Sequence, residues 1–144
     1  MQRAADGLLF AGRIDDLRQI RHSLQQAKVQ NRLHHVGDAV EARAYLRQEG
    51  PYTLAPSPGL VLLDASLPRK SVDDLITELK TNAQLAGIPV IVLLGSESER
   101  RLIENCRFTV DGSIRKPFDL PELVQVLNSV DALSFLRVQS PPTR

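Results

Sequence analysis

Two unbroken apolar runs, residues 60–63 and 90–94, constrain the fold of this chain more than any other feature. They read Leu-Val-Leu-Leu and Val-Ile-Val-Leu-Leu. Short runs without a polar residue are typical of central parallel strands, which helices cover on both faces. Such sheets form where strands and helices alternate along the chain.

That alternation extends over most of the sequence. Further strands are predicted over residues 8–11, 33–36 and 112–115, and apolar residues at helical spacing predict a helix after each strand. Asp15 or Asp16 is expected to cap the first helix and Asp38 the second. Ser96 and Glu99 have the spacing of a capping box. The proline-rich residues 51–58 are expected to form a loop.

The later helices carry further expectations. Leu102, Ile103 and Cys106 are expected on the inner face of the helix that Ser96 starts, and Asp119 or Leu120 is expected to open the last helix. Five βα units in this order predict a doubly wound α/β fold of the flavodoxin-like type, with a five-stranded parallel sheet in strand order 2-1-3-4-5.

In that strand order, the functional crevice lies at the carboxyl ends of strands 1 and 3. The residues that this topology gathers there are Ala11, Gly12, Asp64, Leu94 and Lys116. Asp64 and Lys116 each follow a short apolar strand. A carboxylate and a lysine in such positions are the first requirement of a site that accepts a phosphoryl group.

Composition excludes several other classes. Lys and Arg number 18 against 17 Asp and Glu, so no nucleic-acid partner is expected. No apolar stretch approaches the roughly 18 residues of a membrane span, and we expect a cytoplasmic protein without a membrane partner. Cys106 is the single cysteine. His34 and His35 are adjacent on a strand and point to opposite faces, so no metal site is expected from them.

Four segments in the predicted order carry a family resemblance. They are residues 47–52 (Arg-Gln-Glu-Gly-Pro-Tyr), 62–70 (Leu-Leu-Asp-Ala-Ser-Leu-Pro-Arg-Lys), 80–82 (Lys-Thr-Asn) and 88–93 (Ile-Pro-Val-Ile-Val-Leu). From about Leu8 to Val130, the chain resembles the receiver domain of bacterial response regulators. It is most similar to the small receivers associated with phytochrome-type histidine kinases.

The resemblance implies roles for two residues. Receivers take a phosphoryl group from a kinase histidine onto an aspartate, and Asp64 matches this phosphoacceptor. Lys116 matches the lysine that pairs with the acceptor and later with its phosphate. Family members also carry two acidic residues after the first strand, which hold Mg²⁺ together with the acceptor. Ala11 and Gly12 stand there in this chain, so Mg²⁺ binding is expected to be weak or absent.

Two further positions depart from the family. Leu94 stands where the family has a threonine or serine whose hydroxyl binds the phosphoryl oxygen. Ser113 stands where the family has an aromatic switch residue. Asp15 and Asp16 are expected to cap a helix rather than to replace the missing metal ligands. We therefore interpret the site as degenerate, with no cofactor and no bound metal.

Three functions stay open at this point. The leading hypothesis is a non-enzymatic pseudo-receiver of two-component phosphorelay signalling, which binds a histidine kinase or another signalling protein. The second is a working phosphoacceptor that a histidine kinase phosphorylates on Asp64. The third is a flavodoxin-like protein that binds a small molecule.

The chain is expected to divide into a receiver-like domain, residues 1–131, and a C-terminal extension, residues 132–144. The extension is apolar at first, with Leu133, Phe135, Leu136 and Val138, and its final residues are expected to be disordered. Its apolar part must pack back or cover a partner. A homodimer through the fourth helix, fifth strand and fifth helix, or through the extension, is possible.

Overall fold

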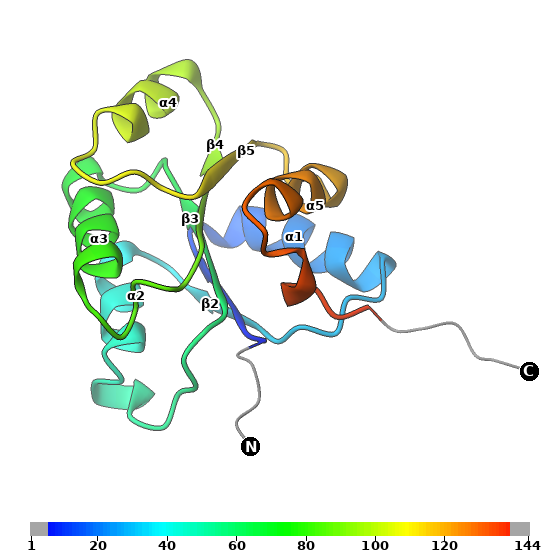
Figure 1. The fold of residues 1–144 in the computed structure, drawn as a ribbon, viewed down its shortest axis with the longest axis horizontal. Helices are drawn as coiled ribbons and strands as arrows, with labels where there is room; N and C mark the ends of the chain where they lie inside the picture. The colour runs from blue at the N-terminus through cyan, green and yellow to red at the C-terminus, as the bar shows by residue number, and fades with distance from the viewer. Residues whose placement is uncertain (1–5, 139–144) are drawn as a thin grey trace, which may run out of the picture.

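The computed structural model describes residues 6–138 and shows one five-stranded parallel sheet between two layers of helices (Figure 1). The strands are β1 (Leu8–Ala11), β2 (Leu33–Val36), β3 (Leu60–Asp64), β4 (Val90–Leu94) and β5 (Gly112–Arg115). Their order in the sheet is β2-β1-β3-β4-β5. The predicted flavodoxin-like fold and strand order are therefore confirmed.

Helices follow the strands as the sequence predicted. They are α1 (Ile14–Gln26), α2 (Ala39–Leu46), α3 (Arg69–Thr81), α4 (Glu97–Glu104) and α5 (Leu120–Ser129). Figure 1 shows α1 and α5 on one face of the sheet and α2, α3 and α4 on the other. Every residue of β3 and β4 is buried, because these central strands have a helical layer on each side.

Side chains that alternate along each strand separate the core into two clusters. On β1, Leu8 and Phe10 pack with the α1–α5 layer, whereas Leu9 and Ala11 pack with the α2–α3 layer. Both clusters are fully apolar at their centres. This arrangement fixes the carboxyl ends of β1, β3 and β5, on which the candidate site depends.

Three predicted helix caps are present. The side chains of Asp38, Ser96 and Asp119 each accept a hydrogen bond from the backbone N–H three residues later. The Glu99 side chain turns back, as in a capping box, but it accepts from the N–H of Gly95 at 2.8 Å rather than from that of Ser96.

Other expectations were wrong in detail. The N-cap of α1 is Arg13, whose side chain makes no capping bond, so neither Asp15 nor Asp16 caps this helix. The predicted loop over residues 51–58 overlaps a short 3₁₀ helix at Gly50–Tyr52. Cys106 lies beyond the end of α4 and lines the loop that follows, because α4 already ends at Glu104.

The segment after α5 packs back onto the domain as far as residue 138. Phe135 and Leu136 lie against the α1–α5 core, whereas Leu133 and Val138 are exposed. The disorder expected after residue 138 falls outside the described residues.

The side chain of Asn31 fastens this segment. Its amide donates to the carbonyls of Asp6 and Phe135, and its oxygen accepts from the N–H of Arg137. Arg137 and Asp6 also form an ion pair at 3.7 Å. None of the helices between residues 6 and 138 has the length and apolarity that crossing a bilayer requires.

Candidate functional site

Asp64 and Lys116 meet at the carboxyl edge of the sheet. Asp64 is the last residue of β3, and Lys116 follows β5, with its N–H donating to the carbonyl of Leu94 at 2.8 Å. The Lys116 ammonium lies 3.1 Å from Oδ1 of Asp64 and 3.2 Å from Oδ2. The N–H of Ser66 donates to Asp64 Oδ1 at 2.9 Å. The two side chains thus form an ion pair.

Asp16 joins this pair, which the sequence reasoning missed. Its Oδ2 lies 3.0 Å from the Lys116 ammonium. Asp16 is the third residue of α1, and this places its side chain at the same edge of the sheet as Asp64. The sequence does show an acidic residue in the first helical turn after β1. A residue at that position can either cap the helix or point into the crevice, and the sequence alone does not distinguish the two. One ammonium therefore bridges two carboxylates.

Burial makes this bridge electrostatically significant. The side chain of Asp64 is 0% exposed, whereas those of Lys116 and Asp16 are 21% and 23% exposed. Burial by itself raises the pKa of Asp64, but the hydrogen bonds from Ser66 and Lys116 outweigh it and hold this pKa below its ordinary value. Asp64 is consequently ionised at neutral pH.

The pKa of Lys116 moves in the opposite direction. Burial lowers it, but the hydrogen bonds to Asp16 and Asp64 outweigh the burial and hold it above the ordinary value of a lysine. Both partners are charged at neutral pH, so Asp64 and Lys116 form a salt bridge that is largely shielded from solvent.

The mouth of the crevice carries a further contact. Nε of Arg13 donates to Oγ of Ser66 at 3.3 Å, which connects the loop after β1 to the loop after β3. The Ser66 backbone in turn holds Asp64. Because Arg13 is exposed, this hydrogen bond lies on the surface rather than in the core.

Ala11 and Gly12 stand where the family resemblance implies an acidic pair. Ala11 is buried in the α2–α3 core. A Cβ atom on Gly12 would lie 2.7 Å from Cβ of Asp64 and 2.7 Å from Cε1 of Phe10. Real Cβ atoms essentially never approach so closely, so position 12 admits no side chain while Phe10 keeps its place. The carbonyl of Gly12 lies 2.7 Å from Nε2 of His35.

The side chains of the other two predicted positions point away from the ion pair, into the α2–α3 core and a separate cavity. Leu94 is buried in the α2–α3 core. Ser113 is half-buried and lines a cavity between α4 and β5. The N–H of Gly95 donates to Glu99, and Ser96 caps α4, so both polar groups next to Leu94 are already engaged within α4 and its start.

His34 and His35 point to opposite faces, as their adjacency predicted. The His34 ring contacts Tyr45 of α2, with centroids 4.5 Å apart, and His35 stacks on Phe10 at 5.6 Å. The structure does not bring them together with the carboxylates.

The residues of the crevice do not fit Mg²⁺. This ion requires near-octahedral oxygen coordination and is usually bound through one or two carboxylates together with several waters. Here the carboxylates of Asp64 and Asp16 are both engaged by the Lys116 ammonium, and Ala11 and Gly12 add none. Within residues 6–138, no group of three or more His, Cys, Asp or Glu side chains is placed to hold a metal.

Comparisons with known proteins agree with this architecture. Residues 13–128 match the family model described as the response regulator receiver domain. The chain is 31% identical to the response regulator Rcp1 of Synechocystis sp. over 117 aligned residues. The aligned region covers 81% of this chain and 80% of Rcp1.

Two solved structures show the same likeness. The phosphorylated cyanobacterial phytochrome response regulator RcpA is 33% identical with a TM-score of 0.68, over 89% of this chain and 92% of that one. The bacteriophytochrome response regulator RtBRR is 26% identical with a TM-score of 0.74, over 85% of this chain and 75% of that one.

Proposed function

Since the chain belongs to the response regulator receiver family of two-component signalling, we propose that it signals by contact with a partner protein, without Mg²⁺-dependent phosphorylation of Asp64. The observation that carries this proposal is the bridge of Lys116 between Asp64 and Asp16. This ammonium engages both carboxylates of the crevice, and Ala11 and Gly12 offer no carboxylate beside them that could hold a cation.

Burial of the acceptor supports the same conclusion. Phosphoryl transfer requires a donor phosphate to reach the carboxylate in line, with cations neutralising its oxygens. The side chain of Asp64 is 0% exposed. A donor would have to displace Lys116 and find a second cation, and the free carboxylates needed to bind one are not present in the crevice.

Leu94 and Ser113 indicate that the protein also lacks the residues that would sense a phosphoryl group on Asp64. A hydroxyl at the end of β4 and an aromatic residue on β5 are what the family resemblance implies for sensing the phosphoryl group. Leu94 offers no donor, and Ser113 has too small a side chain to fill the cavity beside it. Contact with a partner would therefore not depend on a phosphorylation switch.

The partner class follows from the relatives. Two of the similar structures are described as phytochrome response regulators. We propose that the partner is a histidine kinase, of the phytochrome type in particular, or another signalling protein of the same pathway. In this reading the protein is a non-enzymatic module of the cytoplasm.

A homodimer belongs to the same proposal. Phe135 and Leu136 are engaged with the protein's own core, and this leaves Leu133 and Val138 as the exposed apolar residues of the segment after α5. We therefore propose the α4–β5–α5 face, rather than this segment, as the surface on which two copies would meet.

The second candidate function, a working phosphoacceptor, rests on one observation. Lys116 lies within hydrogen-bonding distance of Asp64, as a phosphate-binding lysine must. A kinase that opened the crevice and supplied a cation would restore the acceptor.

One experiment separates the two candidates. The protein is treated with acetyl phosphate, or with beryllofluoride, in the presence of Mg²⁺, and is followed by intact mass and by thermal unfolding. We expect no phosphoryl adduct and no change in melting temperature. A phosphorylatable receiver treated in parallel shows that the reagents are active. An adduct that needs Mg²⁺ and disappears in Asp64→Asn would establish the phosphoacceptor instead.

Partner binding supplies a second test. Asp64→Asn keeps the shape of the side chain and removes its charge. The contact proposal predicts that this variant binds the cognate kinase as tightly as the unchanged protein. Loss of binding in Asp64→Asn, with the fold intact by circular dichroism, would contradict the proposal.

A further inference from the structure

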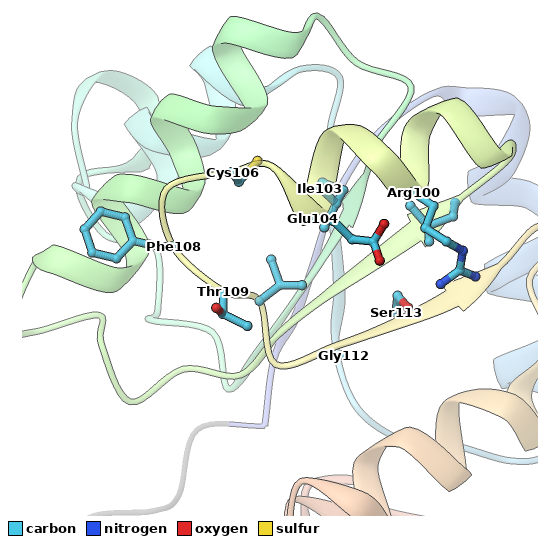
Figure 2. Close-up of a pocket in the computed structure, with 10 residues that line it drawn as sticks. Arg100, Ile103, Glu104, Cys106, Phe108, Thr109, Gly112 and Ser113 are labelled. Atoms are coloured by element: carbon cyan, nitrogen blue, oxygen red, sulfur yellow. The ribbon is translucent and has the colours of Figure 1, made fainter.

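A cavity of about 280 Å³ lies between α4 and β5, away from the Asp64 crevice (Figure 2). Its apolar floor is formed by Leu94, Ile103 and Val110. Ligand pockets for drug-sized molecules have volumes of roughly 300–1,000 Å³. This cavity is at the lower limit, and it suits a molecule about the size of one amino acid rather than a nucleotide.

The cavity exists because β5 presents no large side chain to α4. Ser113 has only a hydroxymethyl group, and it is half-buried at the edge of the cavity. The neighbouring Gly112 faces the other side of the sheet, where a Cβ would collide with Val126 of α5, so Ser113 is the β5 residue that faces α4 at the cavity. No residue of α4 is buried, so the helix spans the opening without filling it.

Two opposite charges stand at the rim. Figure 2 shows the side chains of Arg100 and Glu104 leaving α4 toward β5, with Ser113 across from them. Among the described residues, Arg100 has one ion pair, a long contact of 3.6 Å from Nε to Glu97, and Glu104 has none. Their polar ends are therefore available to a ligand.

We propose that this cavity binds a free α-amino acid with an apolar side chain. The apolar side chain would lie on Leu94, Ile103 and Val110, while the carboxylate meets Arg100 and the ammonium meets Glu104. Charge selects this class: a simple carboxylic acid is repelled by Glu104, and a simple amine is repelled by Arg100. A zwitterionic head satisfies both groups.

Such a ligand would link α4 to β5 by contacts that the unliganded protein lacks. It would do so whether or not Asp64 accepts a phosphoryl group, because the cavity and the crevice share no charged residue. Amino-acid binding and phosphorylation of Asp64 can thus be measured separately.

The test uses three compounds that share one ring and differ in head group: L-phenylalanine, 3-phenylpropanoate and 2-phenylethylamine. Each is titrated into the full-length protein and followed by amide NMR shifts of β5 and α4. L-Leucine, 4-methylpentanoate and 3-methylbutylamine repeat the test for a branched chain. We expect at least one of the amino acids to bind with millimolar affinity, about tenfold more tightly than its own acid and amine.

Charge-neutral variants assign the two contacts. Glu104→Gln should transfer the preference to the acid, and Arg100→Gln should transfer it to the amine. Arg101→Gln is the matched control, because this exposed neighbour on α4 does not line the cavity. It should leave all affinities unchanged.

Filling the cavity assigns the location. Ser113→Phe should abolish binding of the amino acid, and the smaller Ser113→Val should weaken it. The second variant decides the matter if the first fails to fold. The proposal is overturned if neither amino acid produces a saturable shift, if the acid or the amine binds as tightly as its amino acid, or if Ser113→Val leaves the affinity unchanged.

Discussion

The crevice around Asp64 is closed by paired charges, whereas the gap between α4 and β5 stays open. In the crevice, the Lys116 ammonium pairs with two carboxylates, and the side chain of Asp64 is fully buried. In the gap, α4 has no buried residue, and the side chains of Arg100 and Glu104 extend over a cavity. Both regions depart from the residues that the family resemblance implies.

The two regions show two different structural outcomes. At Ala11 and Gly12, where the family resemblance implies an acidic pair, the Phe10 ring packs beside Gly12 and Lys116 pairs with Asp64. At Ser113, where it implies an aromatic residue, a cavity remains beside the small side chain. Buried charge requires compensation, whereas a partly open apolar cavity is tolerated at moderate cost.

Removing the internal cation should have the largest effect. Lys116→Met leaves Asp64 buried without its partner, so we expect a loss of about 3 kcal/mol in the free energy of unfolding. Urea denaturation measures it. Lys70→Met, at an exposed lysine of α3, is the control and should change stability little. Adding Asp64→Asn to Lys116→Met should recover most of the loss, and a double variant as unstable as the single one would disprove the pairing.

Closing the space at Gly12 should rank second. In Gly12→Ala the new Cβ meets Asp64 and Phe10 at 2.7 Å, and we expect a loss of about 2 kcal/mol through overpacking. Gly37→Ala is matched, because Gly37 follows β2 as Gly12 follows β1 and a Cβ there has nothing within 4 Å. Equal melting temperatures for the two variants would show that Phe10 moves aside freely.

Acid should weaken the crevice selectively. The folded pKa of Asp64 is below its unfolded value, so its contribution to stability is full above about pH 4 and is lost as the pH falls through the folded pKa. The difference in unfolding free energy between the unchanged protein and Asp64→Asn should therefore shrink in acid. Denaturation at several pH values tests this, and a difference that grows in acid would reverse the assigned direction.

Asp16 should contribute less, because its side chain is partly exposed. Asp16→Asn is expected to lower the unfolding free energy by about 0.5–1 kcal/mol at low salt, and by less at high salt. Asp15→Asn, on the exposed side of the same helix turn, is the control. The prediction fails if both variants lose the same amount.

Partly filling the α4–β5 cavity should raise the free energy of unfolding, and this effect should be the smallest of the series. Ser113→Val adds apolar volume at the edge of the cavity, and we expect a gain of about 0.5 kcal/mol. Thermal unfolding detects this. A clear loss of stability would mean that the space is less open than its volume of about 280 Å³ indicates.

Much of this organisation was predictable from the sequence. The apolar runs of β3 and β4 identify the central strands, and the carboxyl ends of parallel strands bring Asp64 and Lys116 to one edge. The caps at Asp38, Ser96 and Asp119 follow from local hydrogen-bonding chemistry, which a short segment of sequence carries.

The remaining features depend on distances that no local pattern contains. The start of α1 at Ile14 places Asp16 two residues inside the helix, although a cap at Asp16 fits the same sequence. The exclusion of side chains at Gly12 depends on how closely β1 and β3 bring Phe10 and Asp64 to it. The cavity depends on the separation of α4 from β5.

The hydrogen bonds of Asn31 have a consequence for how the chain can be rearranged. They hold Asp6 and Arg137 together, with an ion pair of 3.7 Å between their side chains. A short glycine-rich connection between these two positions would therefore join segments that are already adjacent. New ends could be opened at Leu54, which is 94% exposed in the loop before β3. Such a circular permutant should keep both the Asp64 crevice and the α4–β5 cavity, since neither lies near the new junction or the new ends.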